Sequence, residues 1–261
     1  MTTVTYTVDD GLASIDLDRP TASNALDCAM KELLLQALSA VRYDATIRAV
    51  ALTASGKNFC VGQDLGEHVE ALRADPGHAM DTVTQHYNPI MLALDAIEVP
   101  VVAGIGGACV GAGLGIALGA DIRIAGQRAK FGTAFCGIGL ASDSGLSATL
   151  ATLIGRSRAT GLFMLGDTID ADTALAWGLI HRVVPDPDVT SETTALARQL
   201  ATGPTAAFKA VKQLITDNAG AALGDVLTRE ARAQALLGAS TDHTTAVEAF
   251  LDKRRPAFVG Q

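Results

Sequence analysis

Residues 99–120 read VPVVAGIGGACVGAGLGIALGA and include no charged side chain. A helix that spans a bilayer needs about 20 apolar residues, so the length of this stretch alone would suit a membrane span. Seven glycines stand in it, at 104, 106, 107, 111, 113, 115 and 119, and each would cost a single helix about 1 kcal/mol relative to alanine. The pattern instead predicts a buried strand at 101–105, a glycine-rich turn and then a buried helix. We expect no membrane span.

The glycine-rich turn, residues 104–115, follows the strand and opens the helix. It contains neither G-x-G-x-x-G nor G-K-[ST], so it predicts neither a dinucleotide site nor a phosphate loop. What it offers is unpaired backbone N–H groups at a helix start, near 111–113, where the helix dipole favours negative charge. The structural alternative is that these glycines serve only close packing of the helix on the sheet.

Strands are concentrated in the first half of the chain. Residues 4–17 alternate on both sides of a turn at 9–11, which predicts a hairpin. A short buried strand is expected at 50–53, and apolar residues at helical spacing after Asp27 predict a helix. Residues 65–84 are polar and have no firm period, so we expect a mobile or variable segment there.

Helices dominate after residue 144, with only a short strand expected at 182–184. Strands that alternate with helices, followed by helices alone, predict an α/β core at 1–203 and a helical C-terminal region at 204–261. Gly203-Pro204 marks the expected boundary.

Composition and charge exclude several classes of protein. The chain has 261 residues, of which 49% are hydrophobic, and this content excludes a disordered chain. Its net charge of −8 is opposite to that of most nucleic-acid-binding proteins, so we expect no nucleic-acid partner. The four cysteines show no zinc-ligand spacing, so we expect no metal site and reduced thiols. The N-terminus shows no signal peptide, and we expect a cytoplasmic protein.

Short motifs characteristic of one known family lie along the whole chain. They read FCVGQDL at 59–65, PVVA at 100–103, ADIRIA at 120–125, AKF at 129–131, ALAWGLI at 174–180 and FLDKRRPAF at 250–258. In these motifs and their order the chain resembles the enoyl-CoA hydratase/isomerase (crotonase) superfamily. The resemblance implies a spiral of ββα units with a C-terminal α-helical trimerisation region, a homotrimer or homohexamer, and an acyl-CoA thioester as substrate. Coenzyme A is then part of the substrate, and no separate cofactor is implied.

The resemblance also implies an oxyanion hole. In this superfamily two backbone N–H groups bind the thioester oxygen, and the matching residues are Gln63 and Ala112. An enolate carries negative charge on that oxygen, and donors already in place stabilise it; removing one such donor typically costs a factor of about 10² to 10³ in rate.

The chain departs from the hydratases at their two carboxylates. The matching positions hold Gly115 and Phe135, neither of which can transfer a proton. Asp143, in the segment GLASDSG at 139–145, supplies a different acid. This segment resembles that of the branch that isomerises ring-1,2-epoxyphenylacetyl-CoA, where the aspartate is the proposed acid/base, except that Ser142 replaces a proline. The 4-chlorobenzoyl-CoA dehalogenases carry a nucleophilic aspartate there, but they pair it with a tryptophan where this chain has Phe135.

Asp143 also has a structural interpretation, because Ser142-Asp143-Ser144 is suited to cap a helix over 144–154. The apolar neighbours Phe135, Ile138 and Leu140 would instead exclude water from the carboxylate and raise its pKa toward that of a useful general base. The two roles are compatible.

Further candidates for ligand contact follow from the resemblance, with core packing or a solvated surface as the structural alternative. The acyl or aryl group is expected to lie near Asp64, Leu65, His86, Gly111, Leu114, Gly115, Phe135 and Leu140. The CoA moiety is expected to contact Asn24, Ala25, Leu26, Lys253, Arg254 and Phe258.

One carboxylate suffices to shift a double bond, because the same group can remove a proton from one carbon and return it to another. We therefore expect an isomerase that acts on Δ3/Δ2-enoyl-CoA or on an epoxyphenylacetyl-CoA-type substrate. The alternatives are an enoyl-CoA hydratase, which would hydrate crotonyl-CoA, and a non-catalytic acyl-CoA-binding protein, which would bind without turnover.

Overall fold

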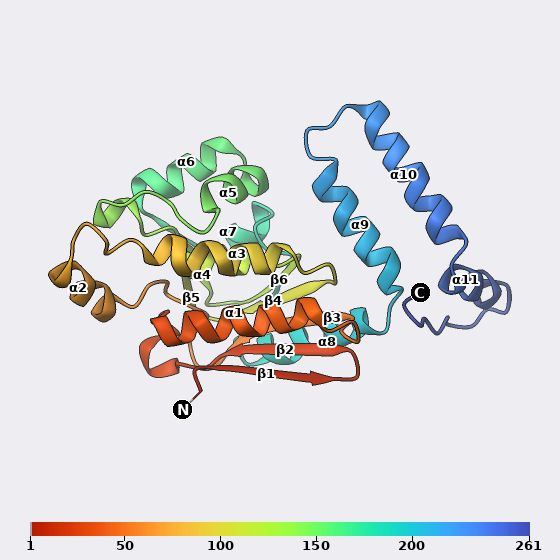
Figure 1. Cartoon of the computed structure of the whole chain (residues 1–261), viewed down its shortest axis with the longest axis horizontal. Helices are drawn as coiled ribbons and strands as arrows, with labels where there is room; N and C mark the ends of the chain where they lie inside the picture. Colours follow the sequence, from red (N-terminus) through yellow and green to blue (C-terminus); the bar gives the residue numbers. More distant parts are fainter. Residues whose placement is uncertain (1) are drawn as a thin grey trace.

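The large sheet has six strands and begins with a hairpin (Figure 1). The computed structural model describes residues 2–261. β1 (Val4–Asp9) pairs antiparallel with β2 (Leu12–Leu17), which confirms the hairpin expected at 4–17. The other strands add in parallel, in the order β1-β2-β3-β4-β6-β9. They are β3 (Ala49–Ala54), β4 (Val101–Ile105), β6 (Ile122–Gly126) and β9 (Arg182–Val184).

A second, three-stranded sheet is built from β5 (Ala108–Val110), β7 (Lys130–Gly132) and β8 (Thr168–Asp170). Cys60 extends it through a parallel bridge to Cys109. The chain thus runs from a strand of the large sheet to a short strand of the small one and then into a helix, as in β4, β5 and α4 (Ala112–Leu118). This arrangement confirms the spiral of ββα units.

Helices cover both faces of the large sheet. α1 (Cys28–Tyr43) and α3 (Asn88–Asp95) pack in the main core on one face, and α8 (Val189–Ala201) packs on the other. A parallel strand between two helical layers has no solvent side, and β3 is accordingly buried over its first five residues. α4 is buried along its whole length.

The segment 65–84, in which the sequence showed no firm period, contains a helix and the start of a π-helical turn. Leu65–Ala74 forms α2, and Val83–Tyr87 forms a π-helical turn that leads into α3. The Asp64 carboxylate caps α2 by accepting from the Glu67 N–H at 3.0 Å. None of the α2 residues is buried, and its apolar residues Leu65, Val69 and Leu72 are exposed.

The helices between β7 and β9 are short. α5 (Leu146–Ile154) and α6 (Arg156–Leu165) pack against each other, and α7 (Ala171–Ala176) lies between β8 and β9. Single 3₁₀ turns occur at Pro20–Ala22, Cys136–Ile138 and Asp186–Asp188.

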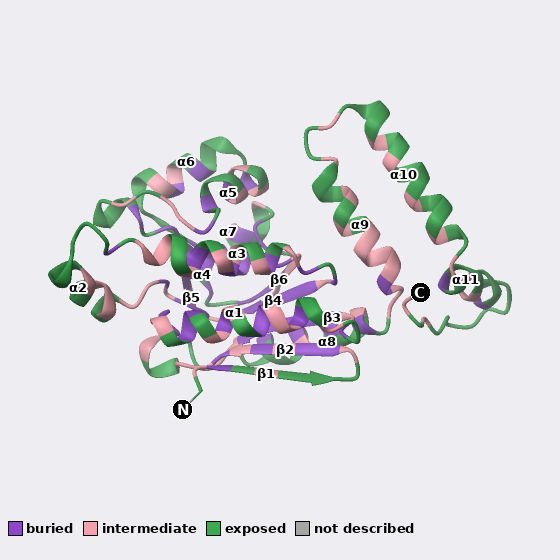
Figure 2. Cartoon of the chain, in the orientation of Figure 1, coloured by how far each residue is buried: buried purple, intermediate pink, exposed green. Residues whose placement is uncertain are grey.

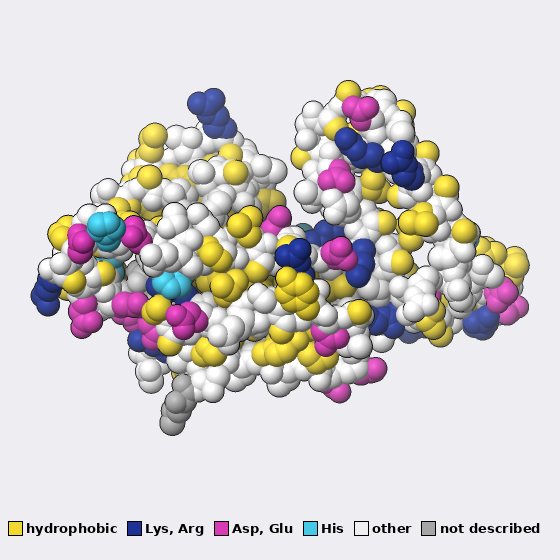
Figure 3. All heavy atoms as spheres, viewed as in Figure 1, with side chains coloured by type: hydrophobic (Ala, Val, Ile, Leu, Met, Phe, Trp, Pro, Cys, Tyr) yellow, Lys and Arg dark blue, Asp and Glu magenta, His cyan; other side chains and the backbone are white. Residues whose placement is uncertain are grey.

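Three C-terminal helices extend away from this core (Figure 1). They are α9 (Thr205–Asp217), α10 (Leu223–Gly238) and α11 (Thr241–Leu251). Their surfaces are mostly exposed (Figure 2) and carry many hydrophobic side chains (Figure 3). The large apolar residues exposed on them are Val211, Ile215, Leu223, Leu227, Leu236, Val247, Phe250 and Leu251. No helix within residues 2–261 combines the length and the hydropathy that a membrane crossing requires.

Candidate active site

Four segments enclose one cavity of about 490 Å³ with a mainly apolar wall. They are the loop 61–66, the stretch 80–87, the start of α4 and the loop 133–143. The cavity brings together nine of the residues to which the sequence assigned a role, and they come from all four proposed roles: acid/base, oxyanion hole, acyl or aryl contact and CoA contact. These are Ala25, Gln63, Asp64, Leu65, Gly111, Ala112, Phe135, Leu140 and Asp143.

The backbone around Gln63 is held by a two-bond bridge to Leu26. The Leu26 N–H donates to the Gly62 carbonyl at 2.8 Å, and the Asp64 N–H donates to the Leu26 carbonyl at 3.2 Å. In a parallel bridge of this kind the N–H of the central residue, here Gln63, points away from Leu26. The Gln63 N–H therefore stays unpaired within residues 2–261, on a residue that lines the cavity.

Ala112, the first residue of α4, carries a second unpaired N–H. The residue before it, Gly111, has φ +58° and provides no side-chain cap, so no group within residues 2–261 accepts from this N–H. The two donor segments touch, since a β-carbon built on Gly62 would lie 3.4 Å from Ala112 N. Gly62 also has φ +84°, which glycine adopts without strain. The cavity thus has two adjacent backbone donors available to an oxyanion.

Asp143 lies on the same cavity wall as the apolar residues Phe135, Ile138 and Leu140. Partial burial raises the pKa of its carboxyl, and the hydrogen bond from Ser144 Oγ to Oδ1, 2.8 Å long, opposes that rise. Asp143 forms no ion pair with any side chain of residues 2–261. A carboxylate that is poorly solvated and unpaired is a competent proton acceptor.

The structure corrects the alternative in which Asp143 caps a helix. α5 begins at Leu146 rather than 144, and its N-cap is Gly145, with φ +71° and no side-chain cap. The Asp143 side chain accepts only from Ser144, while its backbone carbonyl accepts from the Leu146 N–H. The carboxylate is therefore not occupied in capping.

The two positions that match the hydratase carboxylates differ in their surroundings. Phe135 lines the cavity. Gly115 lies inside α4, where a β-carbon would stand 2.5 Å from the Ser144 β-carbon, so a glutamate at 115 would require Ser144 to move. Because α4 packs so closely against Ser144, position 115 has no space for a second carboxylate.

Several of the other predicted residues lie outside the cavity wall. Leu114 is fully buried in the core. The backbone N–H and carbonyl of Leu26 form the bridge described above. The buried Asn24 side chain accepts a hydrogen bond from Arg19 N and donates to the carbonyls of Ser55 and Asn58. These residues shape the loop that carries Gln63.

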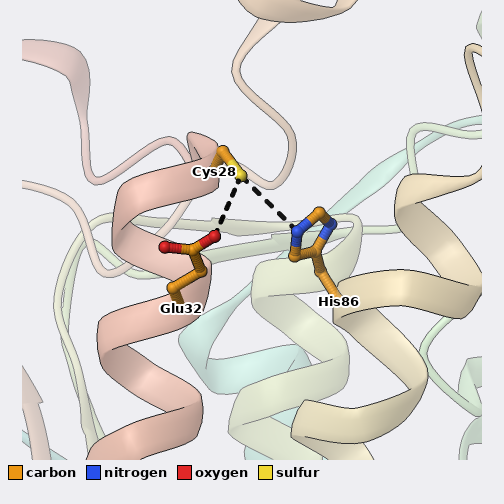
Figure 4. A group of neighbouring side chains, drawn as sticks. All are labelled: Cys28, Glu32 and His86. Carbon is orange, nitrogen blue, oxygen red and sulfur yellow. Dashed lines mark hydrogen bonds between the residues drawn. The ribbon is translucent and has the colours of Figure 1, made fainter.

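His86 belongs to a cluster beside the cavity rather than to its wall (Figure 4). Its Nε2 lies 3.5 Å from Cys28 Sγ, which in turn lies 3.6 Å from Glu32 Oε1, and its Nδ1 lies 3.1 Å from Thr82 Oγ1. One potential ligand atom from each of Cys28, Glu32 and His86 lies within 4.8 Å of the other two, a spacing that a metal ion could bridge. Burial and the Glu32 carboxylate raise the pKa of the Cys28 thiol, which favours the thiol over the thiolate that binds metals.

Lys253, Arg254 and Phe258 follow α11, which lies at the opposite end of the molecule's long axis from α2 (Figure 1). The segment then returns toward the core, where the Phe258 carbonyl accepts from the Arg48 guanidinium at 3.2 Å. Within one chain none of the three lines the cavity. Their assignment to a CoA site stays a prediction that requires a second copy of the chain.

The cavity residues that sequence reasoning did not assign to the site include Met80, Thr82 and Tyr87. They lie in or next to the segment 65–84, whose weak periodicity gave no reason to expect a wall there. His68, also in this segment, lines the cavity.

The comparisons with known proteins agree with this geometry. A family model described as enoyl-CoA hydratase/isomerase matches residues 7–261. A Rhodobacter capsulatus protein named "Probable enoyl-CoA hydratase" is 42% identical over 260 residues, which are 99% of this chain and 98% of that protein. The 1,2-epoxyphenylacetyl-CoA isomerase of Escherichia coli is 38% identical over 255 residues, 97% of each chain.

Among solved structures, one from Mycobacterium abscessus, assigned provisionally as an enoyl-CoA hydratase/isomerase, superposes with a TM-score of 0.98. It shares 66% sequence identity and covers 99% of this chain and 100% of its own. With the fold, the paired backbone donors and the family match in agreement, the chain is a member of the enoyl-CoA hydratase/isomerase family, an enzyme of the crotonase fold.

Proposed function

We propose that this enzyme is an isomerase that moves a double bond in an acyl-CoA between the Δ3 and Δ2 positions, or rearranges an epoxyphenylacetyl-CoA-type substrate. The observation that carries the proposal is a single unpaired carboxylate, Asp143, in one cavity with the free N–H groups of Gln63 and Ala112. Gly115 and Phe135 leave no second acid at the hydratase positions.

The reaction follows from these groups. Asp143 removes a proton from C2 of a 3-enoyl-CoA, and the electron pair moves onto the thioester oxygen. The N–H groups of Gln63 and Ala112 donate to that oxygen and stabilise the dienolate. The protonated Asp143 then returns the proton to C4 while the electrons move back, leaving a double bond between C2 and C3. Atoms and charge balance without a cofactor.

Replacing the base tests the proposal. Asp143→Asn keeps the size of the side chain and its contact with Ser144 but cannot accept the proton. A positioned general base contributes about 10² to 10⁴ in rate, so kcat on a 3-enoyl-CoA should fall by that factor. Asp95→Asn, on an exposed face of α3, is the matched control. An unchanged kcat in Asp143→Asn would remove this residue from the mechanism.

A hydratase is the second candidate, favoured by the name of the Rhodobacter capsulatus relative. Asp143 would then act on a bound water, and crotonyl-CoA would gain one water in mass. Robust hydration of crotonyl-CoA by the wild type, lost in Asp143→Asn, would favour this candidate over the isomerase. Tight binding of acyl-CoA without turnover of either substrate would favour a non-catalytic role.

We also infer that the CoA moiety is bound between subunits. Lys253, Arg254 and Phe258 carry the family resemblance but do not line the cavity of their own chain. In a homotrimer or homohexamer they can approach a neighbour's cavity. Lys253→Ala with Arg254→Ala should then raise KM for the acyl-CoA and leave kcat nearly unchanged, whereas an unchanged KM would contradict a shared site.

A further inference from the structure

Lys31 in α1 is almost completely buried, with 1% of its surface exposed. It forms no ion pair with an Asp or Glu of residues 2–261. Lysine is almost never fully buried without a charged partner, because taking an ammonium out of water is expensive. A buried, unpaired ammonium next to a catalytic cavity therefore needs an explanation.

All its polar contacts are with residues that line the cavity. Lys31 Nζ donates to Gln63 Oε1 at 3.1 Å and to Thr82 Oγ1 at 2.8 Å. It also lies 5.4 Å from the centre of the Tyr87 ring. The Tyr87 hydroxyl donates to the same Gln63 oxygen at 2.5 Å. The Gln63 side chain is thus fixed by two donors.

Gln63 is therefore held from two directions. The bridge to Leu26 fixes the peptides on either side of it, and Lys31 and Tyr87 fix its side-chain amide. The remaining free group of this residue is the backbone N–H that the proposed function assigns to the oxyanion hole. A misplacement of about 1 Å can cost a reaction about 10² in rate, so such restraint has chemical value.

We propose that Lys31 is a positioning residue of the oxyanion hole: it holds Gln63 so that its N–H faces the thioester oxygen, and its buried positive charge favours the enolate over the neutral thioester. The role of Gln63 in this inference rests on the proposed function. Because few solvent dipoles screen a charge in this environment, the cation acts on the cavity more strongly than a surface lysine would.

The ionisation of bound acetoacetyl-CoA tests this role without relying on turnover. Its enolate has its own ultraviolet absorbance, so the ratio of enolate to keto form can be measured on the wild type and on Lys31→Met. We expect at least a tenfold fall in this ratio in Lys31→Met and no change in Lys57→Met, a control at an exposed lysine. An equal ratio in wild type and Lys31→Met, or no enolate on the wild type, would overturn the proposal.

Two further measurements separate positioning from folding. Tyr87→Phe removes the second donor to Gln63 Oε1 and leaves Lys31 intact, so it should lower the ratio as well. In a Gln63→Met background, Lys31→Met should lower the ratio less than it does in the wild type, because only the direct effect of the charge remains; fully additive effects would overturn action through Gln63.

Turnover separates this inference from the proposed function. With a 3-enoyl-CoA, Lys31→Met should lower kcat about tenfold or more and change KM little. If the wild type fails to isomerise but the enolate ratio still depends on Lys31, the isomerase proposal fails and the positioning role stands. If the wild type isomerises and Lys31→Met keeps its kcat, the positioning role fails alone.

Discussion

At the scale of single residues, the proposed function depends on Asp143. Burial raises the pKa of this carboxyl, and the base must be ionised to accept a proton. The kcat/KM for a 3-enoyl-CoA should therefore fall as the pH drops through this raised pKa. A pH–rate profile checks this: an acid limb above the ordinary aspartate value is expected, and a limb at or below 3.8, the ordinary value, would contradict it.

The same raised pKa predicts an effect on stability. At pH values between the pKa of Asp143 in the unfolded chain and its higher pKa in the folded state, the folded state binds more protons than the unfolded chain. The Asp143 carboxyl therefore lowers the free energy of unfolding progressively as the pH rises through this window. Above the pKa of Asp143 in the folded state, the full loss of stability from this group is present. Asp143→Asn should then be more stable than wild type at pH 7, and the difference should vanish below the unfolded pKa. Calorimetry at both pH values measures this, with Asp95→Asn as control; a less stable Asp143→Asn at pH 7 would contradict it.

The residues of the site differ in how far the sequence could predict them. Asp143, Gln63 and Ala112 stand in motifs, and the sequence pointed to each. Lys31 and Tyr87 could not be predicted as site residues. A lysine on an amphipathic helix such as α1 is normally expected on its solvent face, and Tyr87 ends a short π-helical turn that no sequence pattern marked. Their importance arises from contacts between segments that lie far apart in the chain.

At the scale of elements, the start of α4 must lie close to the loop that carries Gln63. A β-carbon at Gly113 would stand 2.4 Å from the Cys60 carbonyl oxygen, so an alanine there would push α4 and the loop apart. Gly113→Ala should destabilise the protein by about 1–3 kcal/mol, as overpacking does, and reduce kcat more than tenfold because the two oxyanion donors separate.

Gly161→Ala in α6 is the matched control for this prediction. Nothing lies within 4 Å of a β-carbon built there. Since alanine favours a helix over glycine by about 1 kcal/mol, this variant should be equally or more stable and fully active. Chemical denaturation of both variants gives the comparison, and equal stability of the two would contradict close packing at 113.

Elements with a strong pattern were predicted and those without one were not. The hairpin, β3, β4 and α1 follow from alternation, apolar runs and the Asp27 cap, which accepts from Met30 N at 2.8 Å. The three-residue strands β5 and β8 are too short to show a period. α2 was missed because it is short and none of its residues is buried, and the start of α5 was misplaced by two residues because Gly145 opens it.

At the scale of the whole molecule, the C-terminal helices expose a group of large apolar side chains, as surfaces that bind a partner do. Phe250 is 83% exposed and Leu236 is 76% exposed. The family resemblance assigns this region to trimerisation, and we expect a homotrimer or homohexamer in solution. Light scattering after size-exclusion chromatography measures the mass directly, and a monomer across the micromolar range would contradict this expectation.

Charges placed on that surface should break the assembly. Leu236→Asp with Phe250→Asp should reduce the measured mass to that of a smaller species, while Tyr43→Asp, on an exposed residue of α1, should not. If CoA is bound between subunits, the dissociated variant should also show a raised KM. An assembly unaffected by both substitutions would place the interface elsewhere.

The central claim is that one carboxylate relocates a proton on the acyl chain without adding water. Incubation of the wild type with a 3-enoyl-CoA in deuterium oxide, followed by mass spectrometry of the product, tests it most directly. We predict a 2-enoyl-CoA that has gained no water and that carries deuterium at C4 only to the extent that protonated Asp143 exchanges with solvent before it returns the proton. The same incubation with Asp143→Asn should leave the substrate unchanged. A product that has gained water, or deuterium uptake that persists in Asp143→Asn, would contradict the account.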